Sequence, residues 1–150
     1  MRLAIKDNLS IGLAMVMALV GVSIIGGGIW LALSNPEQQI IEIKNRHRRA
    51  DVYNLASAIR AATDASSGRP LLGITGSTST IKKTRGADLC TALVPNFMAA
   101  LPVDPDTGYY HDCSNYDTGY TVIRMTTGSN WAFTVAAPSA ELGEVIQKTK

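Results

Sequence analysis

The feature that most constrains this chain is an uncharged apolar stretch near its N-terminus, from Leu9 to Leu33. At about 1.5 Å per residue, a helix of this length crosses the roughly 30 Å hydrocarbon layer of a bilayer. The sequence therefore predicts a transmembrane helix over residues 9–33, preceded by a short cytoplasmic N-terminus over residues 1–8. A cleaved signal peptide is the alternative, because Ala32 to Ser34 fits a small-residue cleavage site, but signal peptides usually have shorter apolar regions.

Charge restricts the partners and leaves the membrane orientation open. The formal net charge is +2, a balance too mild to indicate a nucleic-acid-binding surface, so we expect no nucleic-acid partner. Arg2 and Lys6 precede the apolar stretch, and a basic cluster over residues 44–49 follows it. By count, the positive-inside rule favours a cytoplasmic C-terminus.

The two cysteines indicate the opposite orientation. Cys90 and Cys113 form an even pair in a small membrane-anchored domain, which is typical of an oxidising compartment. We therefore predict a single-pass membrane protein with an extracytoplasmic domain over residues 66–150. The helix-turn-strand pattern between the cysteines can bring their Cα atoms within disulfide distance, and two buried thiols are the alternative.

An amphipathic helix is predicted over residues 34–65, continuing the membrane helix after a kink or restart. Ser34 or Asn35 can cap it, and Pro36 suits its first position. Polar residues such as Asn45, Arg46 and Arg49 are placed off its apolar stripe. We expect the basic cluster to be a solvated or interfacial face, with binding of anionic lipid or DNA as the alternative. The residues predicted to dock this helix on a sheet recur at helical spacing: Val52, Leu55, Ile59 and Ala62.

The C-terminal half combines loop, short-helix and strand patterns. Residues 66–86 are rich in Gly, Ser and Thr and are predicted to form a long loop. Residues 87–101 show helical spacing interrupted by Pro95, and the prolines of "LPVDPDTGYY" end that helix. "GYYHD" and the two runs around "TTGSN" then predict strands. The expected fold class is α+β, a long N-terminal helix packed on a three- to four-stranded antiparallel sheet.

This layout resembles that of type IV pilins and pseudopilins. "RRADVYNLASAIRAA" is similar to the stretch where the long helix of that family leaves the membrane, and "LVPNFMAALPVDPDTGYY" to its passage from helix to sheet. "YDTGYTVIRM" and "WAFTVAAPSAEL" are similar to its strands. The resemblance implies a structural subunit of a pilus-like filament, with the membrane and copies of itself or pilin-like subunits as partners, and with no enzymatic activity and no cofactor.

The chain departs from the family at the processing site. Precursors of that family carry a short basic leader ending in glycine and a glutamate a few residues into the apolar helix. Here Gly12 is followed by "LAMVM", and Met17 stands where the glutamate is expected. A signal-anchored extracytoplasmic component that does not polymerise is therefore the alternative function.

Acidic residues gather near the predicted start of the sheet, chiefly Asp104, Asp106, Asp112 and Asp117. "DPDTG" resembles part of a calcium loop but lacks its later acidic ligand, so we assign the acids to turn capping and leave calcium as the alternative. His111 and Cys113 would share a strand face as a metal pair or a nucleophile with its base, and a disulfide excludes both. No catalytic, cofactor-binding or metal-binding residue is assigned.

Overall fold

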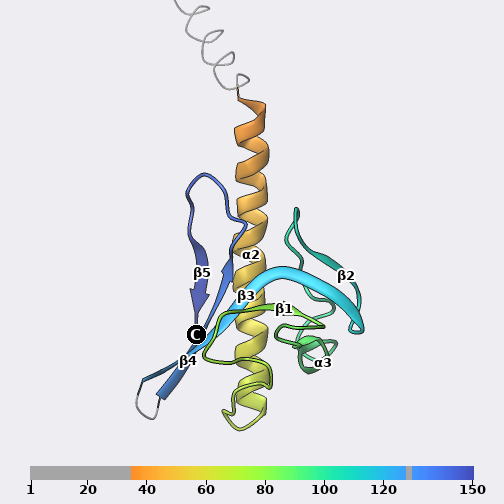
Figure 1. The fold of residues 1–150 in the computed structure, drawn as a ribbon, viewed down its shortest axis with the longest axis vertical. Helices are drawn as coiled ribbons and strands as arrows, with labels where there is room; N and C mark the ends of the chain where they lie inside the picture. The colour runs from red at the N-terminus through yellow and green to blue at the C-terminus, as the bar shows by residue number, and fades with distance from the viewer. Residues whose placement is uncertain (1–34, 128–129) are drawn as a thin grey trace, which may run out of the picture. The chain divides into compact units, whose positions relative to one another are not determined.

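The computed structural model describes residues 35–127 and 130–150 (Figure 1). The predicted N-terminus over residues 1–8 and transmembrane helix over residues 9–33 lie outside these ranges. Among the helices that the structure describes, none has the length and apolar content needed to cross a membrane. The chain divides into two compact units, residues 1–40 and 41–150, and the sheet belongs wholly to the second.

The second unit is an α+β fold, as predicted, with one long helix and a small antiparallel sheet. The sheet has five strands in the order β1-β3-β4-β5, with β2 also paired to β3. In chain order the described elements are α2 (Pro36–Ala65), β1 (Ser79–Lys82), α3 (Cys90–Leu93), β2 (Tyr109–Asp112), β3 (Asn115–Thr127), β4 (Asn130–Ala137) and β5 (Ile146–Thr149).

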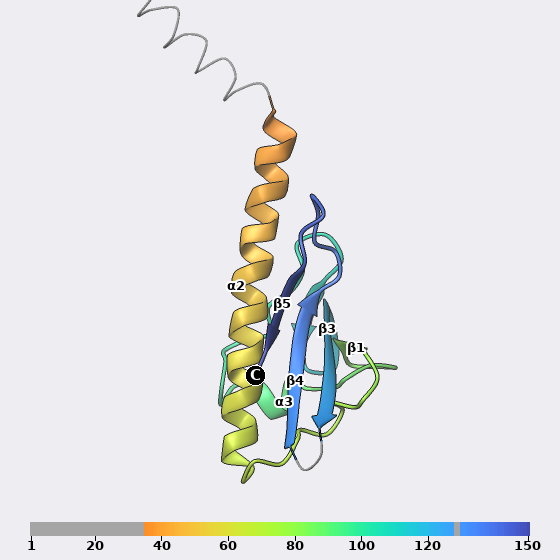
Figure 2. The ribbon, with the colours of Figure 1, turned by 90° about the vertical axis from the view of Figure 1, so that its left-hand side faces the viewer.

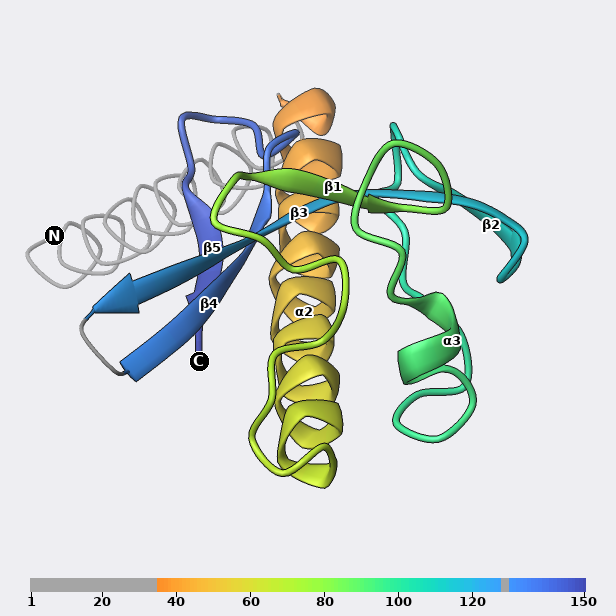
Figure 3. The ribbon, with the colours of Figure 1, turned by 60° about the horizontal axis from the view of Figure 1, so that its bottom comes forward.

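Helix α2 begins at Pro36. Proline suits this first position because a backbone N–H there would have no hydrogen-bond acceptor within the helix. No later glycine or proline interrupts the 30 residues of the helix. The sheet lies along one side of it, with β3 crossing it and α3 on the opposite side from β5 (Figures 1 and 3). The side chains of Val52, Leu55, Ile59 and Ala62 are at most 2% exposed. They share one core cluster with Val122 of β3 and Val135 of β4. Figure 2 shows the sheet lying along one side of α2.

The sheet corrects two sequence predictions. The predicted hairpin is present, since β3 and β4 pair continuously from Thr121 opposite Ala136 to Thr127 opposite Asn130. However, the expected three to four strands are five, because β1 forms inside the segment predicted as a loop and β5 follows the last predicted strand. Each of these four-residue strands buries a single side chain, Ile81 or Ile146, so neither carries the alternating pattern that identifies a strand.

The predicted helix over residues 87–101 is also much shorter than expected. Only Cys90–Leu93 is helical, and the chain then passes through turns at Pro95, which has no N–H to continue the hydrogen-bond ladder. The amides of Phe97 and Met98 both donate to the carbonyl of Leu93 instead. The apolar side chains of this segment pack against the core from turns, so their helix-like spacing does not correspond to a helix.

Candidate functional site

The most strongly connected group of polar side chains lies where α2 meets the turn after Leu101. We call it the Arg48 network, and it comprises Asn45, Arg48, Asp104, Asp106 and Glu141. Arg48 is fully buried, and Asp104 and Asn45 are each 1% exposed. The network joins three segments far apart in sequence: α2, the passage from α3 to β2, and the loop between β4 and β5.

All three guanidinium nitrogens of Arg48 donate hydrogen bonds. Its Nε donates to Asp104 Oδ2 at 2.8 Å, and its Nη2 donates to Asp104 Oδ1 at 3.3 Å and to Asp106 Oδ2 at 2.7 Å. Its Nη1 donates to Asn45 Oδ1 at 3.0 Å and lies 3.6 Å from Glu141 Oε1. Such a fork of donors fixes the direction of its partners as well as their distance.

Asn45 extends the network to the loop after β4. Its Nδ2 donates to the Glu141 carbonyl at 2.9 Å and to Glu144 Oε2 at 2.8 Å, while the Glu141 amide donates to Asn45 Oδ1 at 3.2 Å. Arg49 also forms an ion pair with Glu144. One turn of α2 therefore holds the loop over residues 141–144 through both side-chain and backbone contacts.

These contacts correct in part the expectation that the basic cluster over residues 44–49 is a solvated or interfacial face. Arg46 and Arg49 are exposed, but Arg48 and Asn45 are buried. The sequence does contain a signal for this, because Asn45, Arg48 and Val52 continue the spacing of three and four residues found in the apolar stripe. Because these two side chains are polar, they are expected to lie outside the core. Their positions along the helix, however, put them on the same side as the buried apolar stripe.

The ion pairs shift the pKa values of the acidic members. Burial alone would raise the pKa of Asp104, but the hydrogen bond from Arg48 and those from the amides of Asp106 and Thr107 outweigh it and lower the pKa. The hydrogen bond from Lys44, whose Nζ lies 2.6 Å from Asp106 Oδ1, lowers the pKa of Asp106. Both carboxylates are therefore held in their charged form.

Asp104 also caps the turn that starts the sheet. Its Oδ1 accepts the amides of Asp106 at 3.0 Å and Thr107 at 3.1 Å. Gly108 allows this turn to lie against β3, because a Cβ there would come within 2.6 Å of the Thr118 carbonyl. The lone pairs that a calcium site would need on Asp104 are directed to amides and to Arg48, and within the described residues no cluster suited to a metal ion is found.

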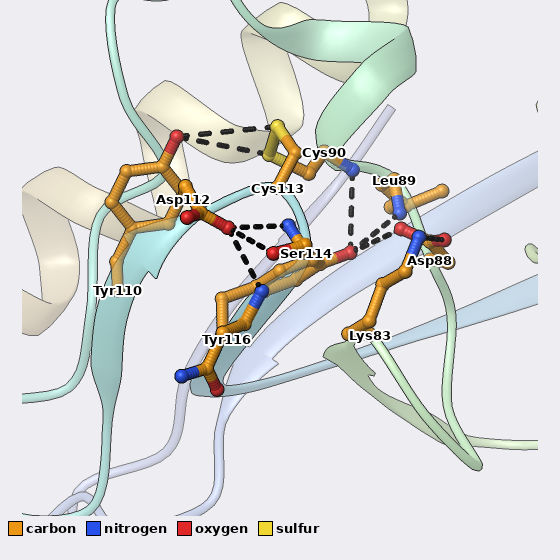
Figure 4. Close-up of a disulfide and its surroundings, with 10 residues drawn as sticks. Lys83, Asp88, Leu89, Cys90, Tyr110, Asp112, Cys113, Ser114 and Tyr116 are labelled. Carbon is orange, nitrogen blue, oxygen red and sulfur yellow. Dashed lines mark hydrogen bonds and ion pairs between the residues drawn. A yellow bond between two sulfur atoms is a disulfide. The ribbon is translucent and has the colours of Figure 1, made fainter.

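The predicted disulfide between Cys90 and Cys113 is present, with a Cα–Cα distance of 5.3 Å (Figure 4). It joins α3 to the turn between β2 and β3, and so closes the segment that contains the Asp104 turn. The Tyr110 hydroxyl lies 3.8 Å from Cys90 Sγ and 4.0 Å from Cys113 Sγ. With Cys113 in a disulfide, the pairing of Cys113 with His111 offers neither a thiolate ligand nor a nucleophile.

A second polar cluster, not predicted from the sequence, supports the disulfide. The buried hydroxyl of Tyr116 donates to Asp88 Oδ1 at 2.7 Å and accepts the amides of Leu89 and Cys90 (Figure 4). Lys83 Nζ lies 2.8 Å from Asp88 Oδ2. Burial and the hydrogen bond to Asp88 raise the pKa of Tyr116, which keeps its hydroxyl protonated as a donor.

Two exposed stripes run along α2. One carries Glu42, Arg46, Arg49, Arg60 and Asp64, whose charges are engaged in ion pairs with each other or with Glu144. The other, which we call the uncharged face, contains Ile43, His47, Ala50, Asn54 and Ala61. It borders an open hollow of about 610 Å³ between α2 and residues 97–102. Charged side chains are depleted at the centres of protein interfaces, so this face has the composition of a contact surface.

The predicted site residues form two sets that meet in one core cluster, since Cys90 belongs to the cluster that contains the docking residues and Cys113 packs against it. The docking residues of α2 lie in this core, and the cysteines form a bridge between α3 and the turn that joins β2 to β3. The acids near the start of the sheet are divided, since Asp104 and Asp106 contact Arg48 whereas Asp117 lies 3.6 Å from Lys82. Comparison of the chain with protein-family models, with curated proteins and with solved structures found no match.

Proposed function

We propose that this chain is a structural subunit of a filament of the type IV pilus or pseudopilus kind. In this proposal residues 9–33 hold the subunit in the membrane, and the domain over residues 66–150 lies outside the cytoplasm. The proposal rests on the resemblance in layout and motifs. The observation that carries it is the order along the chain: an uncharged stretch, then a 30-residue helix, then an antiparallel sheet whose core that helix completes.

The disulfide supports the extracytoplasmic placement. Structural disulfides form in oxidising compartments and are rare in the cytosol. Cys90 is fully buried, so its sulfur is shielded from reductants by the surrounding core. The basic cluster over residues 44–49 favours the opposite orientation by the positive-inside rule, so the proposal places the domain outside the cytoplasm on the disulfide alone.

In a filament, copies must contact each other repeatedly, and we place that contact on the uncharged face of α2. Ile43, Ala50 and Ala61 on this face are small or apolar, and it carries no carboxylate, lysine or arginine, so a second copy can approach the helix closely without stripping water from such a charge. A contact between this face and a different surface of the next copy does not close on itself and therefore generates an open filament.

The decisive measurement is the mass and the physical state of the full chain in its native membrane. Filaments in the fraction sheared from cells, composed of this chain, would support the proposal. A chain that starts at Met1 and never appears in sheared fractions would overturn it.

The uncharged face is tested by Ala61→Arg, with Gln147→Arg on exposed β5 as the matched control. Ala61→Arg should abolish filaments while leaving the melting temperature unchanged, whereas Gln147→Arg should leave both unchanged. Equal filament yields from the two variants would remove the uncharged face from the contact.

The alternative function is a signal-anchored extracytoplasmic component that does not polymerise. Met17 favours it, because the family's glutamate at that place is thought to neutralise the neighbouring subunit's amino terminus. An anchored monomer would show a single particle size in neutral detergent at all concentrations. A filament subunit would instead show concentration-dependent association that Ala61→Arg weakens.

A further inference from the structure

A polar hollow lies at the end of the sheet opposite to the β3–β4 turn. It has a volume of about 500 Å³ and is lined by Lys82, Thr84, Arg85, Tyr109, Tyr116 and Asp117. This volume is within the range of about 300–1,000 Å³ that small-molecule sites occupy. Neither the filament proposal nor the Arg48 network uses any of these side chains.

Three of the lining residues form one row across three strands. Asp117 of β3 is directly opposite Lys82 of β1 on one side and Tyr109 of β2 on the other. Directly opposed residues in an antiparallel sheet share a face, so the ammonium, the carboxylate and the aromatic ring lie side by side. Lys82 Nζ is 3.6 Å from Asp117 Oδ2, and Tyr109 is 48% exposed.

The loop after β1 places a further cation beside this row. It is closed by hydrogen bonds from the Ala87 amide to the Thr80 carbonyl at 2.9 Å and from the Lys82 amide to the Ala87 carbonyl at 3.2 Å. Gly86 is required for this closure, because a Cβ there would collide with the Thr80 carbonyl and the Lys82 side chain. The loop is therefore a defined structure, and the Arg85 and Thr84 side chains start from fixed positions.

Arg85 differs from the other cations near this hollow in two ways. Its backbone has φ of 58°, a conformation that is uncommon for a residue with a side chain and is found disproportionately at functional sites. Lys82 pairs with Asp117 and Lys83 with Asp88, but within residues 35–127 and 130–150 Arg85 has no carboxylate partner. Its guanidinium is free to bind an anionic group from outside the chain.

We propose that this hollow binds a saccharide that carries a carboxylate. The exposed ring of Tyr109 is a flat apolar surface with a polar hydroxyl at its edge, and the apolar face of a pyranose ring can pack against it. Asp117 accepts hydrogen bonds from sugar hydroxyls, and Lys82 and Thr84 donate to them. Arg85 provides the bidentate donor pair that matches a carboxylate.

The charges favour an acidic sugar over a nucleic acid. A phosphate backbone would bring several negative charges past Asp117, which lies at the centre of the row. Of the two cations that line the hollow, Lys82 is paired with Asp117, and Arg85 has no carboxylate partner among the described residues to offset those charges. A saccharide brings one negative charge, which Arg85 can bind, and neutral hydroxyls, which suit the Lys82–Asp117 pair. Binding here is independent of filament assembly, because the hollow does not include the uncharged face of α2.

The test is a titration of the full chain in neutral detergent with two sugars that differ only in the carboxylate. Methyl α-D-galacturonoside and methyl α-D-galactopyranoside are followed by the shifts of backbone amide resonances in the loop over residues 82–86. We expect the galacturonoside to bind at least about tenfold more tightly, because a hydrogen bond to a charged group contributes about that factor. Equal affinities, or no saturation of either sugar below about 50 mM, would overturn the proposal.

Variants assign the binding to individual side chains. Arg85→Gln should reduce galacturonoside affinity to that of the galactoside, and Tyr109→Ala should weaken both sugars about tenfold. Arg69→Gln is the matched control and should change nothing, because Arg69 is another exposed arginine that has no ion pair within the described part of the chain. A ten-nucleotide thymidylate that binds at the same resonances while neither sugar does would show a nucleic-acid site and overturn the saccharide assignment.

Filament yield gives an independent readout. Arg85→Gln should leave the filaments in the sheared fraction unchanged while it abolishes galacturonoside binding. Loss of both together would show that Arg85 supports the fold or the assembly, which contradicts its assignment to a ligand site. Loss of filaments in Ala61→Arg with retained sugar binding would separate the two surfaces.

Discussion

The buried stripe of α2 has an apolar part and a charged part, and they hold the fold by different means. Val52, Leu55 and Ile59 contribute through the area that they remove from water, which depends little on direction. Asn45 and Arg48, one to two turns earlier, contribute through hydrogen bonds with defined partners. The apolar part stabilises the packing of helix on sheet. The charged part determines where the loops after α3 and after β4 are placed.

The difference also lies in what happens when one partner is lost. An apolar side chain can be shortened, and its neighbours then partly collapse into the space. A buried charge that loses its partner remains charged but has no water around it. The loss of stability then comes from the unchanged side chain, which is left buried without a counter-charge. The following changes test this contrast, in decreasing order of expected effect.

Leu55→Asp should have the largest effect, because it places an unpaired charge in the apolar part of the stripe. Leu55 is fully buried, so we expect a loss of more than about 4 kcal/mol in the free energy of unfolding, enough to unfold the domain. Circular dichroism melting of the full chain in neutral detergent measures this. Asn54→Asp, the same charge at the neighbouring exposed position, should melt like the wild type. An unchanged melting curve for Leu55→Asp would disprove the docking of α2.

Arg48→Met should cost about 3–5 kcal/mol, because it leaves the carboxylate of Asp104 buried without its cation. Urea unfolding measures the loss, and Arg60→Met, at an exposed ion pair, should cost less than about 1 kcal/mol. Adding Asp104→Leu to Arg48→Met should recover part of the loss, since the second change removes the stranded charge. A double variant that is less stable than both single variants would show that the turn capped by Asp104 matters more than the ion pair.

Removal of the disulfide should rank next. Cys90→Ala with Cys113→Ala releases a segment with a sequence separation of 23 residues, and the chain-entropy model then gives a loss of about 3 kcal/mol. A reductant should lower the stability of the wild type and leave the double variant unchanged. If the wild type were equally stable with and without reductant under conditions that reduce the bond, the Asp88–Tyr116 cluster alone would be sufficient to hold α3.

The smallest effect is a pH dependence in which two carboxylates act in opposite directions. The pKa of Asp104 is lowered, so its contribution is complete above the unfolded value of about 3.9 and is lost as the pH falls through the folded value. Burial raises the pKa of Asp51, which accepts a 2.7 Å hydrogen bond from the Tyr120 hydroxyl. Its folded state therefore takes up a proton more readily, and stability rises as the pH falls toward about 3.9.

Asp51→Asn isolates the second of these carboxylates while keeping an acceptor for Tyr120. In urea unfolding from pH 7 to pH 3, this variant should lose the rise in stability above about pH 3.9 and retain the fall below it. A pH profile parallel to that of the wild type would show that Asp51 has no shifted pKa in the fold.

Hydrophobic periodicity was sufficient for α2 and for the β3–β4 hairpin, because each buries several side chains at one regular spacing. It failed for β1 and β5, because each of these strands buries only one side chain, Ile81 or Ile146. These two segments are strands because they pair with a neighbouring strand, which the local sequence pattern does not reveal. The disulfide was predictable because proline and turn residues reverse the chain between the cysteines.

The Arg48 network was only half visible in the sequence. The helical position of Arg48 follows from its spacing to Val52, so its burial could have been inferred. Its partner Asp104 lies 56 residues further along, and the choice among Asp104, Asp106, Asp112 and Asp117 depends on how the turn folds against β3. The same holds for the row of Lys82, Asp117 and Tyr109, which exists only once both outer strands have paired with β3.

The Cys90–Cys113 bridge has a mechanical consequence. When a folded chain is pulled from its two ends, each residue that unravels adds at most about 3.3–3.6 Å of length. The bridge spans 23 residues between α3 and the β2–β3 turn, so roughly 80 Å of contour length cannot be released while it is intact. The Asp104 turn lies inside this locked segment. Force applied along the chain bypasses that turn through the two sulfur atoms and reaches β3 directly.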